Sequence, residues 1–205
     1  MVIGVWGKKI GMTQIFDNER VIPVTVINLD HWIVTNIKRK DRDGYEAVQV
    51  GCLRDKYISQ PFSLQWLKNL KKYFSHIREI KDVDIVSDVK IGQPAEFYTL
   101  LKLGDSIDIS GITKGCGFAG VVKRYGFSGP PGSHGSTMGN RPGSIGSFCS
   151  QGKVVKGKRL PGHKGVQKRF IRRLKVVRIE PEMKIMLVKG SVPGKVGSLL
   201  FVRKA

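Results

Sequence analysis

The chain has 205 residues, of which 40% are hydrophobic, so it can build one hydrophobic core and one ordinary domain. Its 36 Lys and Arg outnumber 16 Asp and Glu, and the net charge of +20 favours nucleic acid as the partner, ahead of an anionic membrane surface. Three unevenly spaced cysteines argue against a disulfide framework, the N-terminus does not have the pattern of a signal peptide, and no apolar run approaches the roughly 18 residues of a membrane span, so we expect a soluble cytosolic protein.

The first fifty residues alternate between apolar and polar side chains, as short β-strands do. Pro23 interrupts a β-branched run and predicts an edge or a bulge there. Several short strands joined by tight turns favour a small antiparallel sheet closed into a barrel. We expect strands at 2–6, 12–16, 21–29, 31–38 and 45–52, with turns at 7–11, 17–18 and 43–44.

Between residues 59 and 80 the apolar spacing becomes helical, with Leu64, Leu67 and Phe74 on one face and Pro61 near the start. This predicts a helical insertion at about 60–80 that lies against the barrel; its lysine-rich face could contact RNA or remain solvated. Strand signals return from 83 to 109. We expect three C-terminal strands, at 174–179, 184–189 and 198–203, to complete the sheet.

The segment from Ile109 to Ile179 contains no Asp or Glu, although the average of 16 in 205 residues would place several there. It carries fifteen Lys or Arg and fifteen of the 25 glycines, so it cannot fold stably alone in water. The chain therefore reads as a single domain of residues 1–205, with a body at about 1–110 and 174–205 and a basic arm at about 111–173.

Motifs for catalysis and cofactors are incomplete in this arm. Gly115–Gly120 matches G-x-G-x-x-G, but the fingerprint requires a βαβ unit and an acidic residue about 20 positions later, and none follows before Glu180. Ser133 and His134 lack an acidic residue nearby to orient the imidazole. The cysteines and histidines lack the spacing of a metal site. We predict no cofactor, no metal and no enzymatic activity; a nucleotide-binding enzyme, a hydrolase and a membrane-surface protein remain the alternatives.

The arm suits an RNA that encloses it. Its basic residues occur in small clusters that could follow a phosphate backbone, and its glycines permit close approach. As an out-and-back loop, residues 126–165 could reach at most roughly 65–70 Å. The aromatic residues of the arm could stack on unpaired bases or form small local cores: Phe118, Tyr125, Phe127, Phe148 and Phe170.

Short motifs of specific order and spacing run along nearly the whole chain, and residues 53–103 are the least distinctive part. The motifs are Gly7-Lys-Lys-Ile-Gly-Met-Thr-Gln-Ile-Phe16, Lys114-Gly-Cys-Gly-Phe-Ala-Gly-Val-Val-Lys-Arg124, Gly126-Phe-Ser-Gly129, Ser133-His-Gly-Ser136, Arg141-Pro-Gly-Ser-Ile-Gly146, Lys156-Gly-Lys-Arg159, Pro161-Gly-His163 and Leu187-Val-Lys-Gly-Ser-Val-Pro-Gly194. Together they resemble the motifs of the universal large-subunit ribosomal protein L-three family, of the bacterial or organellar type.

The resemblance implies a mainly β fold: a translation-protein-type antiparallel β-barrel with a helical insertion and a long extended basic loop. It implies direct binding of large-subunit (23S-type) rRNA near its 3′ end, an early role in subunit assembly, and a loop tip at about 139–156 that approaches the peptidyl-transferase centre. Neighbouring large-subunit ribosomal proteins would be further partners. We expect no membrane partner, no small-molecule substrate and no homo-oligomer. The location would be the cytoplasmic ribosome, or an organellar ribosome if the source is an organelle. The methylated glutamine of bacterial members would fall at Cys149, so that modification is not predicted.

The predicted rRNA contacts combine the basic side chains of the N-terminal motif, the arm and its return, with two histidines. They are Lys8, Lys9, Lys114, Lys123, Arg124, His134, Arg141, Lys153, Lys156, Lys158, Arg159, His163, Lys164, Lys168, Arg169, Arg172 and Arg173.

Overall fold

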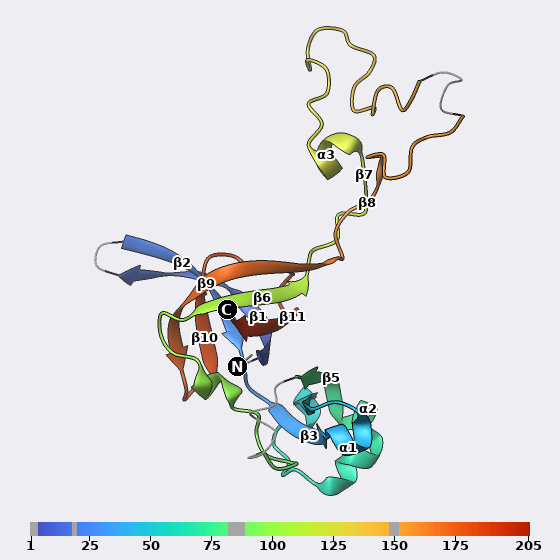
Figure 1. The fold of residues 1–205 in the computed structure, drawn as a ribbon. Helices are drawn as coiled ribbons and strands as arrows, with labels where there is room; N and C mark the ends of the chain where they lie inside the picture. Colours follow the sequence, from blue (N-terminus) through green and yellow to red (C-terminus); the bar gives the residue numbers. More distant parts are fainter. Residues whose placement is uncertain (1–3, 18–19, 82–88, 148–151) are drawn as a thin grey trace. The chain divides into compact units, whose positions relative to one another are not determined.

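The computed structural model describes residues 4–17, 20–81, 89–147 and 152–205 (Figure 1). The chain divides into two compact units, one of Met1–Ile112 with Lys168–Ala205 and the other of Thr113–Gln167. The structure is mainly β, as predicted. The second unit ends six residues before the expected limit of the arm at 173, because residues 168–173 belong to a long strand of the first unit.

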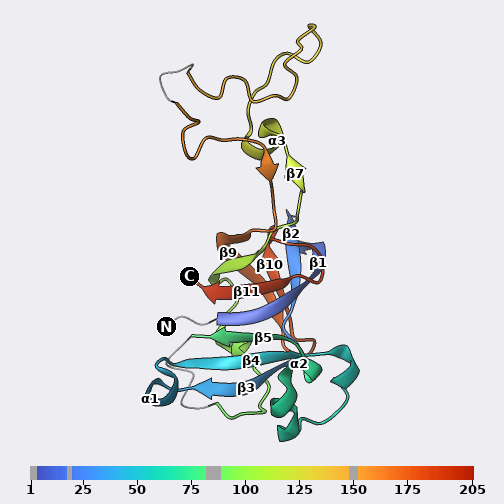
Figure 2. The same cartoon turned by 90° about the vertical axis from the view of Figure 1, so that its right-hand side faces the viewer.

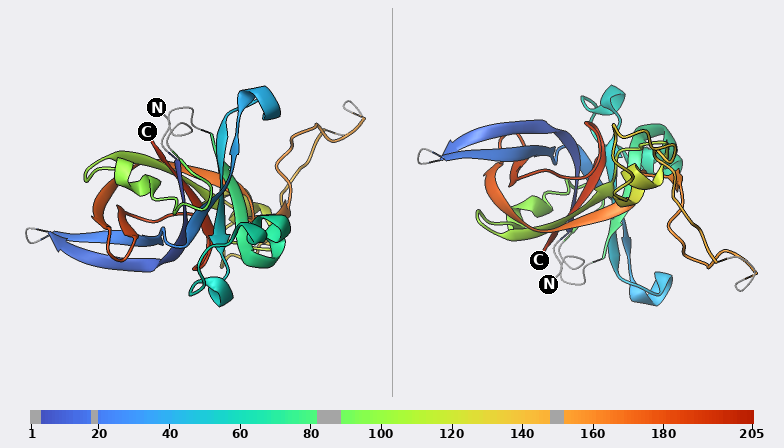
Figure 3. Two further views of the ribbon diagram at one scale, coloured as in Figure 1. Left: turned by 90° about the horizontal axis from the view of Figure 1, so that it is seen from below. Right: turned by 90° about the horizontal axis from the view of Figure 1, so that it is seen from above.

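Six strands of the first unit form a closed barrel in the order β1-β11-β6-β9-β10-β2, and each neighbouring pair is antiparallel (Figures 1 and 3). The first two strands come from the N-terminal part of the chain, and the last three follow the second unit, so the sheet is completed from both ends of the sequence. The strands are β1 (Gly4–Asp17), β2 (Arg20–Asn28), β6 (Ser106–Ile112), β9 (Lys168–Glu180), β10 (Ile185–Lys189) and β11 (Leu199–Lys204).

The barrel core is built from alternate residues of these strands, as the two-residue period of a strand requires. Ile107 and Ile109 of β6 are fully buried, and so are Met186 and Val188 of β10. Each such side chain contributes about 1.5–3 kcal/mol by leaving water. The hydroxyl of Thr25, buried among them, donates to the carbonyl oxygen of Gly190 at 2.6 Å, so its polarity is satisfied.

A separate antiparallel sheet contains β3 (Trp32–Lys38), β4 (Ala47–Leu53) and β5 (Phe74–Ile80) (Figure 2). The prediction that residues 31–38 and 45–52 belong to the barrel sheet is therefore wrong. The connection between β3 and β4 is also longer than the tight turn expected at 43–44. It contains the short helix α1 (Lys40–Asp43), which ends at Gly44 with a left-handed φ of 81°. The Asp43 carboxylate accepts from Lys38 and Arg42 at 3.1 Å each and stabilises this longer connection.

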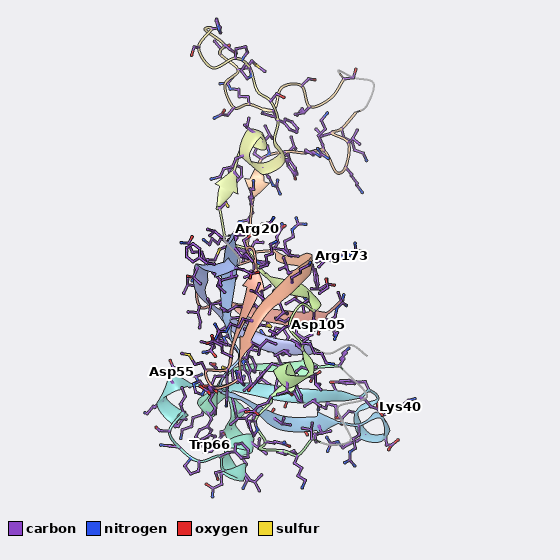
Figure 4. All side chains as sticks on the ribbon, turned by 90° about the vertical axis from the view of Figure 1, so that its left-hand side faces the viewer. Arg20, Lys40, Asp55, Trp66, Asp105 and Arg173 are labelled. Carbon is purple, nitrogen blue, oxygen red and sulfur yellow. The ribbon has the colours of Figure 1, made fainter. Side chains whose placement is uncertain are left out.

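The predicted helical insertion at 60–80 is shorter than expected and is divided. The 3₁₀ segments η1 (Asp55–Tyr57) and η2 (Leu64–Asn69) and the short helix α2 (Leu70–Tyr73) end where β5 begins. Phe74, placed on the helical stripe by its spacing, is instead the first residue of β5, pairs with Leu53 and is 2% exposed. Pairing with β4 outweighs the local helical period here, since tertiary contacts routinely override propensity. Trp66 anchors the insertion and stacks on Tyr73 at 5.1 Å (Figure 4).

Two other expectations are corrected and one is confirmed. Residues 7–11, expected as a turn, lie within β1; a β-carbon on Gly7 would be 2.6 Å from Ile27, so this glycine serves close packing. Of the strand signals after 83, residues 82–88 lie outside the described part, and 89–105 contain η3 (Phe97–Leu100) before β6 begins. The three predicted C-terminal strands are confirmed as β9, β10 and β11.

Candidate nucleic-acid interface

The two ends of the second unit run antiparallel and are joined by backbone hydrogen bonds. The short strand β7 (Phe118–Ala119) pairs with β8 (Gly162–His163). Next to this pair, Cys116 N–H donates to the carbonyl of Lys164 at 2.9 Å and Lys164 N–H donates to Gly117 at 3.0 Å. We call residues 113–126 and 159–167 the root of the unit. These bonds bring the outgoing and returning chains together.

The Arg124 side chain stabilises the root through contacts with other root residues. It lies on α3 (Val121–Tyr125), which ends at Gly126 with a left-handed φ of 74°. Its guanidinium donates to the carbonyl of Leu160 at 2.6 Å and lies over the Tyr125 ring at 5.0 Å. A β-carbon at Gly162 would be 2.6 Å from this guanidinium, so a larger residue there would require the Arg124 side chain to shift. Arg124, predicted to bind rRNA, thus already has a structural role within the protein.

Residues 127–158 form an open loop between the two sides of the root. Its described residues, 127–147 and 152–158, contain no helix or strand and make only two backbone–backbone hydrogen bonds with one another, Arg141 to Met138 and Lys158 to Val155. Apart from half-buried Pro142, the described residues from 131 to 159 are exposed. An exposed backbone with so few internal hydrogen bonds leaves its polar groups available to a partner.

The charges of the second unit all have one sign. Its 55 residues include nine Lys or Arg and no Asp or Glu. No acidic side chain within the unit can therefore neutralise them, and a polyanion supplies the matching charge best. Seven of the nine are exposed, while Arg124 and Lys164 are half-buried and bond to main-chain carbonyls, of Leu160 and Lys123 respectively. The exposed ones are Lys114, Lys123, Arg141, Lys153, Lys156, Lys158 and Arg159.

In the first unit, β9 carries a second group of basic side chains. Lys168, Arg169, Arg172 and Arg173 are all exposed, and Figure 4 shows Arg173 on this strand. A β-bulge positions Arg172 and Arg173. Ile107 pairs with Leu174 and Ile109 with Ile171, so both arginines lie opposite the single residue Asp108. Arg173 has a left-handed φ of 56° at this point.

Comparison with known proteins finds relatives along the whole chain. A family model described as Ribosomal protein L3 matches residues 78–185. The chain is 41% identical over 208 residues to the large ribosomal subunit protein uL3 of Synechococcus sp. (strain CC9902), which covers 100% of this chain and 94% of that protein. The uL3 proteins of Prochlorococcus marinus (strain NATL2A) and Herpetosiphon aurantiacus are 42% and 41% identical, also over 100% of this chain.

The chain belongs to the ribosomal protein L3 family. The resemblance inferred from the motifs is confirmed, and the alignments extend over both units. The matched segment 78–185 includes β6, the whole second unit and β9, which together hold most of the predicted rRNA contacts of this L3 chain.

One predicted contact does not fit the structure. Lys9 of this L3 chain is 8% exposed, and its ammonium group donates to the carbonyls of Val192 at 3.0 Å and Gly194 at 3.3 Å. A buried ammonium with carbonyl partners stabilises the barrel and is not presented to RNA. We therefore withdraw Lys9 from the interface. Lys8, its neighbour in β1, is half-buried and remains a predicted contact.

The two predicted histidines lie in different parts of the second unit. His134 is exposed in the open loop. His163 is exposed on β8, opposite Phe118 of β7. Phe118 is 80% exposed, which favours stacking on a partner over a local core. Tyr125, by contrast, lies under the guanidiniums of Arg124 and Arg159, so its ring belongs to the root.

Several described features bear on the nucleotide, metal and membrane interpretations of the sequence. The Gly115–Gly120 motif is followed by a helix of five residues, and the Cys116 N–H is already bonded to Lys164. Among the described residues no group of three His, Cys, Asp or Glu could hold a metal ion. No described helix is long and apolar enough to cross a bilayer. Phe148 and Cys149, the methyl-glutamine position, lie outside the described residues.

Sequence reasoning missed the residues that build the root. Gly165 has a left-handed φ of 89°, and a β-carbon there would be 2.1 Å from the Lys114 carbonyl oxygen. The Leu160 carbonyl accepts the hydrogen bond from Arg124. The Gln167 carbonyl accepts one from the Thr113 N–H at 3.0 Å. The clustering of glycines at 162 and 165 was the available signal. The glycines of the arm were expected to permit close approach of RNA, whereas at these two positions they permit close approach of the protein's own atoms, the Arg124 guanidinium and the Lys114 carbonyl.

Proposed function

We propose that this chain is a structural protein of the large ribosomal subunit that binds large-subunit rRNA directly through its second unit and the basic edge of β9. Membership of the L3 family makes it a ribosomal protein of the large subunit. The observation that carries the rRNA proposal is the combination of nine unbalanced basic side chains with a loop whose backbone makes few internal bonds.

The chemistry of the loop suits an irregular RNA fold. Seven exposed Lys and Arg neutralise phosphates and supply most of the affinity, because each contact releases condensed counterions. Glycines with left-handed φ, such as Gly135 and Gly143, turn the chain sharply without bulky side chains. Such a segment follows a cavity between RNA elements better than the groove of a regular duplex.

The remaining expectations of the family resemblance are part of the same proposal. The binding region would lie near the 3′ end of the large-subunit rRNA, and the protein would act early in subunit assembly. The loop tip at about 139–156 would approach the peptidyl-transferase centre and support the geometry of the catalytic RNA. We propose no catalytic role for the protein itself, since the second unit contains no carboxylate to complete an acid–base or nucleophilic arrangement.

The experiment is co-sedimentation of the tagged full chain with ribosomal particles from its own cell. We expect it in the large subunit and in assembled ribosomes at one copy each, and it should remain there through a wash at moderate salt. Recovery of the chain only in the soluble fraction, or release together with membrane vesicles, would reject the proposal.

A further inference from the structure

The β1–β2 hairpin carries exposed apolar side chains that the rRNA-binding proposal does not use. β1 pairs with β11 only over Gly4–Lys8, and β2 pairs with β10 only over Val24–Asn28. Toward the end of this hairpin β1 and β2 pair with each other, residues 11–13 with 24–26 and 14–17 with 20–23, and no third described strand pairs with residues 11–17 or 20–23 (Figure 3). We call this two-stranded part the hairpin tip.

One face of the hairpin tip is mainly apolar, with Gln14 as the polar residue among its described side chains. Phe16 lies opposite Val21, and Met12 shares their face because side chains alternate along a strand. Phe16 is 71% exposed, Met12 52% and Val21 54%. Scattered exposed apolar residues are ordinary on a protein surface, but three on one face of a two-stranded hairpin form a patch that favours a protein partner.

The charge of this region differs from that of the rest of the chain. The 28 residues from Ile10 to Ile37 contain one basic residue, Arg20, and three acidic ones, Asp17, Glu19 and Asp30. In a chain with 36 basic residues in 205, several would be expected. Asp30 follows β2 and is paired with Lys184, so the tip itself contains Asp17 and Glu19 with one basic residue, Arg20, which lies opposite Asp17. A surface without a cation surplus favours a cationic polypeptide over RNA as its partner.

The backbone of the tip also offers an edge. From Gly11 to Asp17 the side of β1 that faces away from β2 pairs with no described strand. On β2, Pro23 lacks an N–H and blunts the other edge. An exposed, apolar edge strand is a template for strand addition or for side-chain packing by a neighbouring chain, and natural proteins leave such edges uncovered rarely.

We infer that the hairpin tip is a docking site for a basic segment of another large-subunit protein, whose apolar side chains cover Met12, Phe16 and Val21. This inference rests on the proposed function, since the ribosome would supply the partner. Basic residues of that segment face Asp17, and the rRNA is bound elsewhere on the chain. Three features of the tip favour this occupant: a mainly apolar face, a local lack of basic side chains and an open strand edge.

The test places a photo-crosslinking side chain at the tip by the change Phe16→p-benzoylphenylalanine in the full-length protein. Large subunits purified from cells that carry it are irradiated, and the adduct is mapped by mass spectrometry. We expect an adduct to a Lys- and Arg-rich peptide of another large-subunit protein. The same group at Leu103, which is 66% exposed in the turn before β6, is the matched control and should not reach that peptide.

An adduct formed mainly with rRNA, an adduct with a second copy of this chain, or the absence of an adduct would each overturn the inference. Failure of the unmodified chain to co-sediment with large subunits would count against the proposed function instead. Co-sedimentation without an adduct at Phe16 would count against the docking site alone.

A second measurement uses the partner that the adduct identifies, in purified form. The double variant Phe16→Thr, Val21→Thr should weaken its binding to this chain by about tenfold or more, because apolar anchors dominate such interfaces. The variant should keep the thermal midpoint and the rRNA affinity of the parent chain. The control double variant Leu103→Thr, Met183→Thr changes two other exposed apolar residues and should bind normally. Equal binding by the tip variant and the control would overturn the inference.

Discussion

The carboxylate of Asp108 accepts the backbone N–H of Arg173 at 3.1 Å, and this contact holds the β-bulge in β9. The same carboxylate accepts from the Arg203 guanidinium at 2.9 Å. One acidic side chain therefore fixes the backbone from which Arg172 and Arg173 project. In a chain with a large surplus of cations, the few carboxylates of the barrel have a positioning role as well as an electrostatic one.

The first prediction concerns this bulge. The change Asp108→Asn removes the ion pair with Arg203 and weakens the bond to Arg173, and we expect it to lower the free energy of unfolding by about 1–2 kcal/mol. Urea unfolding of the full chain measures the effect. Asp41→Asn, at an exposed carboxylate of α1, is the control and should change stability little. Equal loss in both variants would contradict the positioning role of Asp108.

The bulge also predicts a pH dependence. The Arg203 guanidinium and then the Arg173 N–H lower the pKa of the Asp108 carboxyl below its ordinary value of 3.8. A carboxyl with a lowered folded-state pKa contributes stability that is present above the unfolded-state pKa and is lost as the pH falls through the folded-state pKa. The stability difference between the parent chain and Asp108→Asn should therefore be constant near neutral pH and shrink below about pH 4.

The second prediction tests the withdrawal of Lys9 from the RNA interface. Lys9→Met removes two hydrogen bonds from a buried ammonium to carbonyls and leaves those carbonyls without this donor. We expect a loss of about 1.5–3 kcal/mol in the free energy of unfolding, with no change in the salt dependence of rRNA binding. Lys195→Met, at an exposed lysine, is the control for the removal of one charge. A lower salt slope at full stability would restore Lys9 to the interface.

The third prediction separates the two neighbouring cations of α3. Arg124→Met breaks the bond to Leu160 and should increase hydrogen exchange of the amides in β7 and β8 of the free protein. It should also weaken rRNA binding more than Lys123→Met does, because the loosened root must be ordered on binding. Lys123 is exposed on the same helix and serves as the matched control. Identical exchange and affinity in the two variants would show that Arg124 is only a phosphate contact.

The fourth prediction concerns the close approach at Gly165. An alanine there places a β-carbon against the Lys114 carbonyl and adopts a left-handed φ, so Gly165→Ala should open the root. We expect faster exchange of the Thr113, Cys116 and Lys164 amides. Gly132→Ala has open space around its β-carbon and should leave these amides unchanged. Unchanged protection in Gly165→Ala would mean that the root tolerates a shifted backbone.

Much of the fold follows from local sequence patterns, and what does not follow depends on distant contacts. Alternation predicted the strands that form β2, β10 and β11, because each has one face in the barrel core. The period at Phe74 predicted a helix, whereas pairing with β4 makes it a strand; no local feature encodes that partner. The basic character of the second unit was evident from composition, since charge requires no tertiary information. The structural roles of Lys9 and Arg124 could not be predicted from the sequence. Their carbonyl partners, in Val192, Gly194 and Leu160, are distant along the chain.

The salt dependence of rRNA binding tests the central claim most directly. In one variant a flexible Gly/Ser linker replaces residues 128–158, which removes four of the nine basic side chains of the unit and keeps β7, α3 and β8. Binding of the parent chain and the variant to a fragment from the 3′ region of large-subunit rRNA is measured across a salt series. The account predicts a steep slope for the parent and a slope lower by about 3 log units of affinity per log unit of salt for the variant, with both proteins folded. Equal slopes, or a nearly flat dependence for the parent chain, would contradict it.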